Sequence, residues 1–201
     1  MQIVLASNNV DKIIEFNQLF ATTDFTIIPQ SQFNVFEVEE TGLTFVENAI
    51  IKARNACLYS GLPVVADDSG LVVDALNGAP GVRSARYAHE KATYKENRVA
   101  LLEALHEVPE EKRLARFYCV LVYLRYVYDP SPIICYGCWA GSVLLEDSGE
   151  NGFGYDPIFF VPTHGCSAAE LSLEVKNQIS HRGQALRKLL KVLNVYYKQS
   201  F

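Results

Sequence analysis

Residues 114–128 have the sequence LARFYCVLVYLRYVY, and residues 133–145 have the sequence IICYGCWAGSVLL. Both runs are rich in the β-branched and aromatic residues that favour strands. The four residues that join them, Asp129-Pro130-Ser131-Pro132, are typical of a turn stiffened by proline. The two runs therefore predict a long β-hairpin at about residues 114–145.

Outside this hairpin, segments with helical and strand periodicity alternate along the chain. Thr44 and Glu47 match the capping box that opens a helix, and Gly61 ends that helix. We expect strands at residues 2–6, 25–28, 63–66 and 71–73, and helices around residues 13–20, between 44 and 61, at 93–107 and from about 180. This alternation, with one long hairpin, predicts an α/β fold with a mixed sheet.

Length and composition bound the class of protein. The 201 residues are 49% hydrophobic and 20% charged, which is typical of one globular domain spanning residues 1–201 and excludes a disordered, collagen-like or coiled-coil chain. The net charge of −5 disfavours a nucleic-acid-binding protein, because phosphate contacts need Lys and Arg. Five scattered cysteines favour reduced thiols over a disulfide framework. No signal peptide or membrane span is evident, so we expect a cytoplasmic protein without membrane contact.

A polar segment, residues 7–12 (SNNVDK), follows the first predicted strand and opens the first helix. A helix N-terminus presents free N–H groups and suits phosphate, and Lys12 adds a positive charge. An ordinary N-cap followed by a surface lysine is the alternative.

Carboxylates gather in residues 39–42 (EETG) and 66–70 (ADDSG). Adjacent aspartates after an apolar strand are costly unless their charge is compensated. Carboxylate oxygens are ligands of Mg²⁺, and one carboxylate could also take a proton from an attacking water. The alternative is an Asp-Ser-Gly turn whose carboxylates cap backbone N–H groups.

Two later segments could hold a flat ligand. In residues 152–157 (GFGYDP), two glycines flank Phe153, which could stack on a base; buried aromatics around a plain turn are the alternative. Lys176 and residues 180–183 (SHRG) could bind phosphate or carbonyl oxygens, or could be a solvated helix start.

Two further patterns are weaker. Asn48, Lys52 and Asn55 form a polar stripe on one helix, which is usually a solvated face unless it turns toward carboxylates. Cys135 and Cys138 form an isolated CxxC pair, which is weak evidence for zinc or redox chemistry.

Together and in this order, these segments resemble the Ham1/RdgB family of inosine triphosphate pyrophosphatases. The resemblance also includes residues 78–88 (GAPGVRSARYA) and covers essentially the whole chain. It implies an elongated, two-lobed α/β fold with a central curved mixed sheet flanked by helices, the long hairpin extending into the second lobe and the active-site cleft lying between the lobes. It also implies Mg²⁺-dependent hydrolysis of the non-standard purine nucleotides ITP, dITP and XTP to monophosphate and pyrophosphate, by a homodimer.

The resemblance assigns roles residue by residue. Asp68 is the catalytic carboxylate and, with Glu40, holds Mg²⁺; Asp67 stays open as the alternative base. Asn8 stands where the family usually has glycine. The substrate-binding positions are Ser7, Asn8, Asn9, Val10, Asp11, Lys12, Lys52, Ser69, Phe153, Gly154, Tyr155, Asp156, Lys176, His181 and Arg182.

Base choice would rest on donors near His181 and Arg182, which pair with the oxygen at C6 of hypoxanthine or xanthine and disfavour the amino group of adenine. Two other functions fit the same residues: a pyrophosphatase for modified pyrimidine nucleotides, as in the Maf-type proteins, and a non-catalytic nucleotide sensor.

Overall fold

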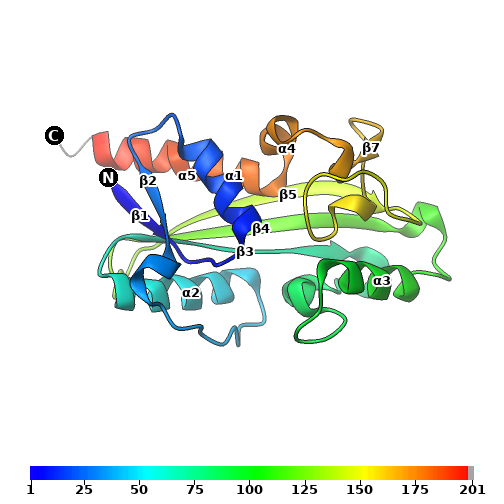
Figure 1. Cartoon of the computed structure of the whole chain (residues 1–201), viewed down its shortest axis with the longest axis horizontal. Coiled ribbons are helices and arrows are strands. Elements are labelled where there is room, and N and C mark those ends of the chain that lie inside the picture. Colours follow the sequence, from blue (N-terminus) through cyan, green and yellow to red (C-terminus); the bar gives the residue numbers. More distant parts are fainter. Residues whose placement is uncertain (199–201) are drawn as a thin grey trace. The chain divides into compact units, whose positions relative to one another are not determined.

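The computed structural model describes residues Met1–Lys198 and contains a seven-stranded sheet in the order β2-β1-β3-β4-β5-β6-β7 (Figure 1). β1 is parallel to β2 and β3, whereas β6 is antiparallel to β5 and β7, which confirms the predicted α/β class with a mixed sheet. The strands are β1 (Gln2–Leu5), β2 (Thr26–Pro29), β3 (Val64–Val73), β4 (Leu114–Leu124), β5 (Ile133–Val143), β6 (Phe159–Val161) and β7 (Cys166–Ser167). The α-helices are α1 (Val10–Phe20), α2 (Phe45–Ser60), α3 (Tyr94–Ala104), α4 (Leu173–Ile179) and α5 (His181–Lys198).

The chain divides into two compact units. The first contains residues 1–68, 119–137 and those from Arg182 onward, and the second contains residues 69–118 and 138–181. The boundaries fall within β3, β4 and β5 and at the start of α5.

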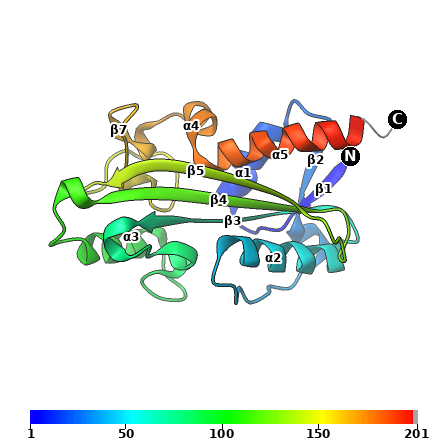
Figure 2. The ribbon, with the colours of Figure 1, turned by 180° about the vertical axis from the view of Figure 1, so that it is seen from behind.

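In the first unit, helices cover both faces of the sheet: α1 and α5 lie on one face and α2 on the other (Figures 1 and 2). Strand alternation explains this arrangement, because neighbouring residues of a strand point to opposite faces. Ile3 and Val65 pack with Phe16 of α1 and Leu189 of α5. Their neighbours pack against the small side chains of α2, in a cluster that includes Val4, Val64, Ala66, Ala49, Ala53 and Ala56.

The capping box predicted for α2 is confirmed, since Thr44 accepts a hydrogen bond from Glu47 N while Glu47 Oε2 accepts from Thr44 N. Gly61 ends the helix with a φ of +64°, which only glycine adopts at little cost.

The prediction of two short strands at 63–66 and 71–73 around a turn was wrong. A single strand, β3, runs through Asp67-Asp68-Ser69-Gly70. A strand tolerates two buried aspartates here because cationic side chains compensate both carboxylates, as described below. The helix α4, just before the predicted C-terminal helix, was not expected from the sequence.

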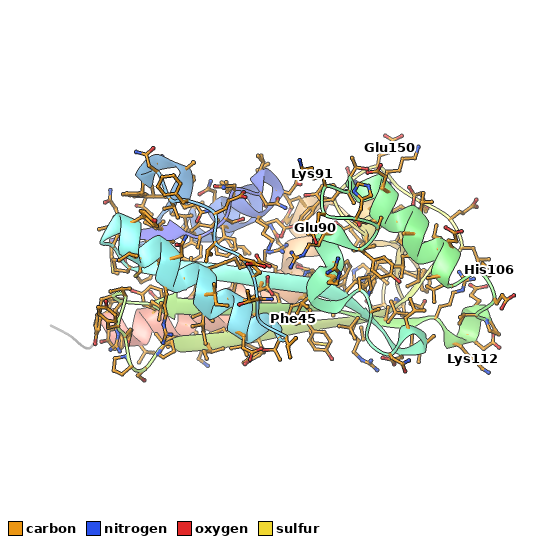
Figure 3. The ribbon with its side chains drawn as sticks, turned by 90° about the horizontal axis from the view of Figure 1, so that it is seen from below. Phe45, Glu90, Lys91, His106, Lys112 and Glu150 are labelled. Carbon is orange, nitrogen blue, oxygen red and sulfur yellow. The ribbon has the colours of Figure 1, made fainter. Side chains whose placement is uncertain are left out.

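In the second unit, α3 begins at a second capping box formed by Thr93 and Glu96. Figure 3 shows Glu90 and Lys91 ahead of this helix and His106 beyond its last turn. Leu101 and Leu105 pack with apolar residues of the sheet strands, including Leu71, Phe117 and Phe159.

All five cysteines are free thiols. Cys135 is buried whereas Cys138 is exposed, because residues three apart in β5 point to opposite faces, so the CxxC pair does not form one binding site. Within residues 1–198, no helix is long and apolar enough to cross a membrane.

Candidate active site

The two adjacent aspartates of β3 point to opposite faces of the sheet and have different partners. Asp67 lies on the side of α1 and α5 and contacts Lys12 and Arg182. Asp68 lies on the side of α2 and contacts Lys52. The strand geometry thus separates two carboxylates that are neighbours in sequence.

Asp67 is completely enclosed by donors. Its Oδ1 lies 2.6 Å from Lys12 Nζ, and its Oδ2 accepts from Arg182 Nε at 2.7 Å and from the thiol of Cys119 at 3.4 Å. Burial alone would raise the pKa of Asp67, but the charges of Arg182 and Lys12 outweigh it and hold that pKa well below its usual value. Asp67 is therefore an ionised carboxylate whose lowered pKa makes it a weak proton acceptor.

The pKa of Asp68 shifts in the opposite direction. Burial raises the pKa of Asp68 and Glu40 adds to the effect, while Lys52 and Lys12 oppose it. Asp68 Oδ1 accepts from Lys52 Nζ at 2.6 Å. Asp68 Oδ2 is buried and has no hydrogen-bond partner among residues 1–198. A buried carboxylate oxygen without a donor is costly, so this atom is available for a proton, a cation or a water.

Lys52 joins the carboxylates of Asp68 and Glu40. Its Nζ lies 2.6 Å from Asp68 Oδ1, 3.0 Å from Glu40 Oε1 and 3.0 Å from the carbonyl oxygen of Asp67. Burial lowers the pKa of Lys52, but Asp68 and Glu40 together raise it above its usual value, so the ammonium group stays charged. We call Lys12, Glu40, Lys52, Asp67 and Asp68 the carboxylate–lysine cluster.

The polar stripe of α2 forms hydrogen bonds with the acidic loop that contains Glu40. Asn48 is fully buried, and its Oδ1 accepts from Gly42 N at 2.8 Å. Asn55 Nδ2 donates to the carbonyl oxygen of Phe36 at 2.8 Å. The stripe is therefore not a solvated face: it fixes both sides of Glu40, and Lys52 holds the carboxylate itself.

The first polar loop leads into α1 through an N-cap. Asn9 Oδ1 accepts from Lys12 N at 3.1 Å, and Asn9 N donates to Ser7 Oγ at 3.1 Å. The usual family glycine is not required at Asn8, whose φ is not positive and whose Oδ1 accepts from Gln30. Val10 is exposed and Asp11 is half-exposed in the first turn of the helix.

Arg182 is held by carboxylates. Its Nη1 donates to Glu15 Oε2 at 2.6 Å and its Nε to Asp67. All three side chains are buried, and Asp67 and Glu15 more than offset the burial of Arg182, so its pKa lies above the usual range.

Glu15 and Cys119 were missed in the sequence. Glu15 could have been found: it stands three residues after Lys12 and one before the buried Phe16, so it shares a helix face with the lysine. Cys119 carries no comparable signal, since a buried strand cysteine is common.

In the second unit, four predicted residues lie together. Lys176 Nζ donates to Asp156 Oδ2 at 2.6 Å and lies 4.6 Å from the centre of the Phe153 ring. Asp156 Oδ2 also accepts from Phe153 N at 2.8 Å. Tyr155 is buried, and its hydroxyl donates to the carbonyl oxygen of Ser84 at 2.9 Å, which gives it a structural role in the second unit.

His181 is buried rather than at a solvated helix start. Its ring stacks on Phe117 with the centroids 4.7 Å apart and 8° between the planes. Lys176 is also buried, so the solvated alternative does not hold for either residue. Ser69 is half-buried directly after Asp68 in β3.

Comparison with known proteins agrees with these features. A sequence model of the Ham1 family matches residues 3–192. The chain is 56% identical over 198 residues to the dITP/XTP pyrophosphatase of Vibrio parahaemolyticus, covering 98% of this chain and 99% of that protein. It is 55% identical over 192 residues to the dITP/XTP pyrophosphatase of Shigella flexneri, covering 96% and 98%.

Solved structures give the same result. A Ham1 protein of Coxiella burnetii has a TM-score of 0.90 at 52% identity, covering 96% of this chain and 98% of that one. The Ham1 protein of Staphylococcus aureus has a TM-score of 0.86 at 43% identity, covering 98% of this chain and 100% of that one. The matched residues span nearly the whole sequence, and the chain belongs to the Ham1 family.

Proposed function

We propose that the protein hydrolyses the non-standard purine nucleotides ITP, dITP and XTP to the nucleoside monophosphate and pyrophosphate. Relatives that are more than half identical over nearly their full length are named dITP/XTP pyrophosphatases, which supports this substrate class. The observation that carries the proposed chemistry is the difference between two adjacent aspartates: Asp67 is fully paired, whereas Asp68 Oδ2 has no donor within residues 1–198.

The residues present fit a magnesium ion. Glu40 and Asp68 supply hard oxygen donors that meet at Lys52, and Asp68 Oδ2 is a buried oxygen without a donor. Residues 1–198 contain no group of three or more His, Cys, Asp and Glu side chains suited to a metal. Mg²⁺ does not need one, because it commonly takes one or two carboxylates and completes its octahedron with waters and substrate phosphates. When bound, the ion would neutralise phosphate charge.

Asp68 is the proposed general base. A water molecule attacks the α-phosphorus, its proton passes to the carboxylate of Asp68, and the bond from the α-phosphorus to the bridging oxygen breaks, so that pyrophosphate leaves with the electron pair. The raised pKa of Asp68 favours this role, because a base works best when its pKa approaches the working pH. Asp67 is unsuited to it, because Arg182 and Lys12 hold its pKa well below the usual value.

The two lysines of the cluster have different roles in this proposal. Lys52 has three oxygen neighbours at 2.6–3.0 Å, one for each ammonium hydrogen, and thus organises the carboxylates. Among residues 1–198, Lys12 donates only to the side chain and carbonyl oxygen of Asp67. One N–H of Lys12 therefore remains for a phosphate oxygen, next to the N-terminus of α1.

We assign base binding to Phe153, Lys176 and His181, as the resemblance implies. Lys176 and His181 carry donors that would pair with an oxygen at C6 and meet the amino group of adenine unfavourably. Arg182 remains a predicted contact, although two of its nitrogens already serve Asp67 and Glu15.

A nucleotide panel tests the proposal. The protein would be incubated with Mg²⁺ and ITP, dITP, XTP, GTP, ATP or a modified pyrimidine triphosphate, and the products identified chromatographically. Monophosphate and pyrophosphate from the first three, with little from ATP, are expected. Turnover of modified pyrimidines alone would make it a different pyrophosphatase, and binding without products would make it a nucleotide sensor.

We further propose a homodimer in the cytoplasm. The dimer follows only from the family resemblance, and sedimentation equilibrium would test it. Five free cysteines suit a reducing compartment, and fractionation of cells would test that location.

A further inference from the structure

The loop at residues 147–156 has a conformation that its own sequence does not fix. Gly152 and Gly154 flank Phe153 with φ values of +72° and +62°. Glycine samples these and other backbone regions readily, so the position of the Phe153 ring depends on contacts from outside the glycine pair.

Arg98 of α3 supplies such a contact at both ends of the loop (Figure 3 shows the helix). Its Nε lies 2.9 and 3.0 Å from the two carboxylate oxygens of Asp147, and its Nη2 lies 2.7 Å from Asp147 Oδ2. Its Nη1 donates to the carbonyl oxygen of Gly154 at 3.0 Å. One guanidinium thus joins two points that lie seven residues apart in the loop.

The same face of α3 also touches the aromatic ring. Tyr94 stands four residues before Arg98, one helical turn away, and its ring centre lies 5.9 Å from that of Phe153. In addition, Lys176 Nζ lies over the ring and Asp156 Oδ2 accepts from Phe153 N. Phe153 is therefore held by α3 as well as by the buried Lys176–Asp156 pair.

Stability alone does not account for this arrangement. The Asp147 side chain is 45% exposed and that of Arg98 14%, so solvent screens the carboxylate and limits what the pair adds to the free energy of folding. A planar guanidinium that binds a carboxylate through several N–H groups also fixes the relative orientation of the two side chains. We infer that Arg98 is a positioning residue for nucleotide binding, which closes the loop so that Phe153 is presented in one place; this rests on the proposed function of Phe153.

The first test needs no nucleotide. Hydrogen–deuterium exchange of the loop would be compared in the wild type, Arg98→Met and Arg83→Met. Arg83 is the matched control, because its side chain is more than half exposed and, among residues 1–198, its one ion pair is with the exposed Glu90 at 3.5 Å. We expect the amides of residues 152–156 to exchange at least about tenfold faster in Arg98→Met, as in a locally opened segment, and to be unchanged in the control.

The second test measures kinetics with ITP. Arg98→Met should raise KM about five- to tenfold, the net effect of one ordinary hydrogen bond, with kcat within about twofold of the wild type. Asp147→Asn should raise KM by less, because Arg98 still donates to the carbonyl oxygen of Gly154 in that variant. Arg98→Lys should have a KM between those of the wild type and Arg98→Met.

The outcomes separate this inference from the proposed function. Unchanged exchange and unchanged KM in Arg98→Met would overturn the inference, as would a fall in kcat that follows a lowered melting temperature. Faster loop exchange in a protein whose wild type releases no pyrophosphate would confirm the loop closure and refute the proposed function.

Discussion

Asp67 Oδ2 accepts a hydrogen bond from Arg182 Nε at 2.7 Å, although 115 residues separate the two in sequence. Both side chains are buried, and Lys12 and Glu15 extend the contact into a chain of alternating charge. This chain connects β3 with α1 and α5 inside the first unit. Asp67 thus lies within buried ion pairs on both of its oxygens, which favours the neighbouring Asp68 as the proposed base.

Asp67→Asn should therefore act mainly on stability. The change leaves Arg182 and Lys12 with one fewer negative charge, and removing one partner of a buried ion pair costs about 3–5 kcal/mol. Urea unfolding followed by Trp139 fluorescence would measure the change in the free energy of unfolding. The control is Asp74→Asn, whose pair with Arg116 is well exposed and should contribute less than about 1 kcal/mol. Equal losses in the two variants would contradict the assignment.

Asp68→Asn should act mainly on activity. An amide cannot take the proton of the attacking water, so pyrophosphate release from ITP should fall about 10²–10⁴-fold. The free energy of unfolding should fall by less than in Asp67→Asn, because burial already disfavours the charged form of Asp68 and Lys52 keeps Glu40 as a partner. Turnover near that of the wild type would remove Asp68 from catalysis.

Acid should abolish activity before it unfolds the protein. The pKa of Asp68 is raised, so its neutral form appears at a pH above the usual value of about 3.9, and a neutral carboxyl is no base. Protonating Asp68 favours the folded state. Asp67 has a lowered pKa, so its contribution to stability is present above about pH 3.9 and is lost only as the pH falls through its lower folded value. The pH profile of kcat/KM and circular dichroism over the same range would check the order, and coincident midpoints would contradict it.

Much of the fold could be predicted from local sequence. The capping box of Thr44 and Glu47, the ending of α2 at Gly61 and the alternation of the long hairpin are short-range signals, and each lies where predicted. The failure was β3, because Asp-Asp-Ser-Gly favours a turn locally. Only distant residues, Lys12, Lys52 and Arg182, make a strand acceptable there, and no local pattern contains them.

The candidate site shows the same limit. Lys52 and Glu40 could be singled out in the sequence as residue types. The sequence does not show that the ammonium group of Lys52 joins Glu40 to Asp68, because this contact depends on how α2 packs beside β3. The burial of Arg182 against Glu15 could not be predicted either, because a helix start rich in polar residues is usually solvated.

The acidic loop offers a last prediction, at Gly42. A methyl group built at this position would lie 2.5 Å from Glu47 Cβ and 2.7 Å from Asn48 Oδ1, closer than such atoms can approach. Gly42→Ala should push the loop away from Asn48 and displace Glu40, two residues earlier. Disturbing the support of a metal-binding carboxylate commonly costs 10–100-fold in metal affinity, so the Mg²⁺ concentration for half-maximal activity should rise by about that factor. Thr41→Ala, at the exposed neighbour, is the control and should change neither Mg²⁺ dependence nor exchange of the Gly42 amide with solvent. Gly42→Ala with wild-type Mg²⁺ dependence would show that Asn48 does not set the position of Glu40.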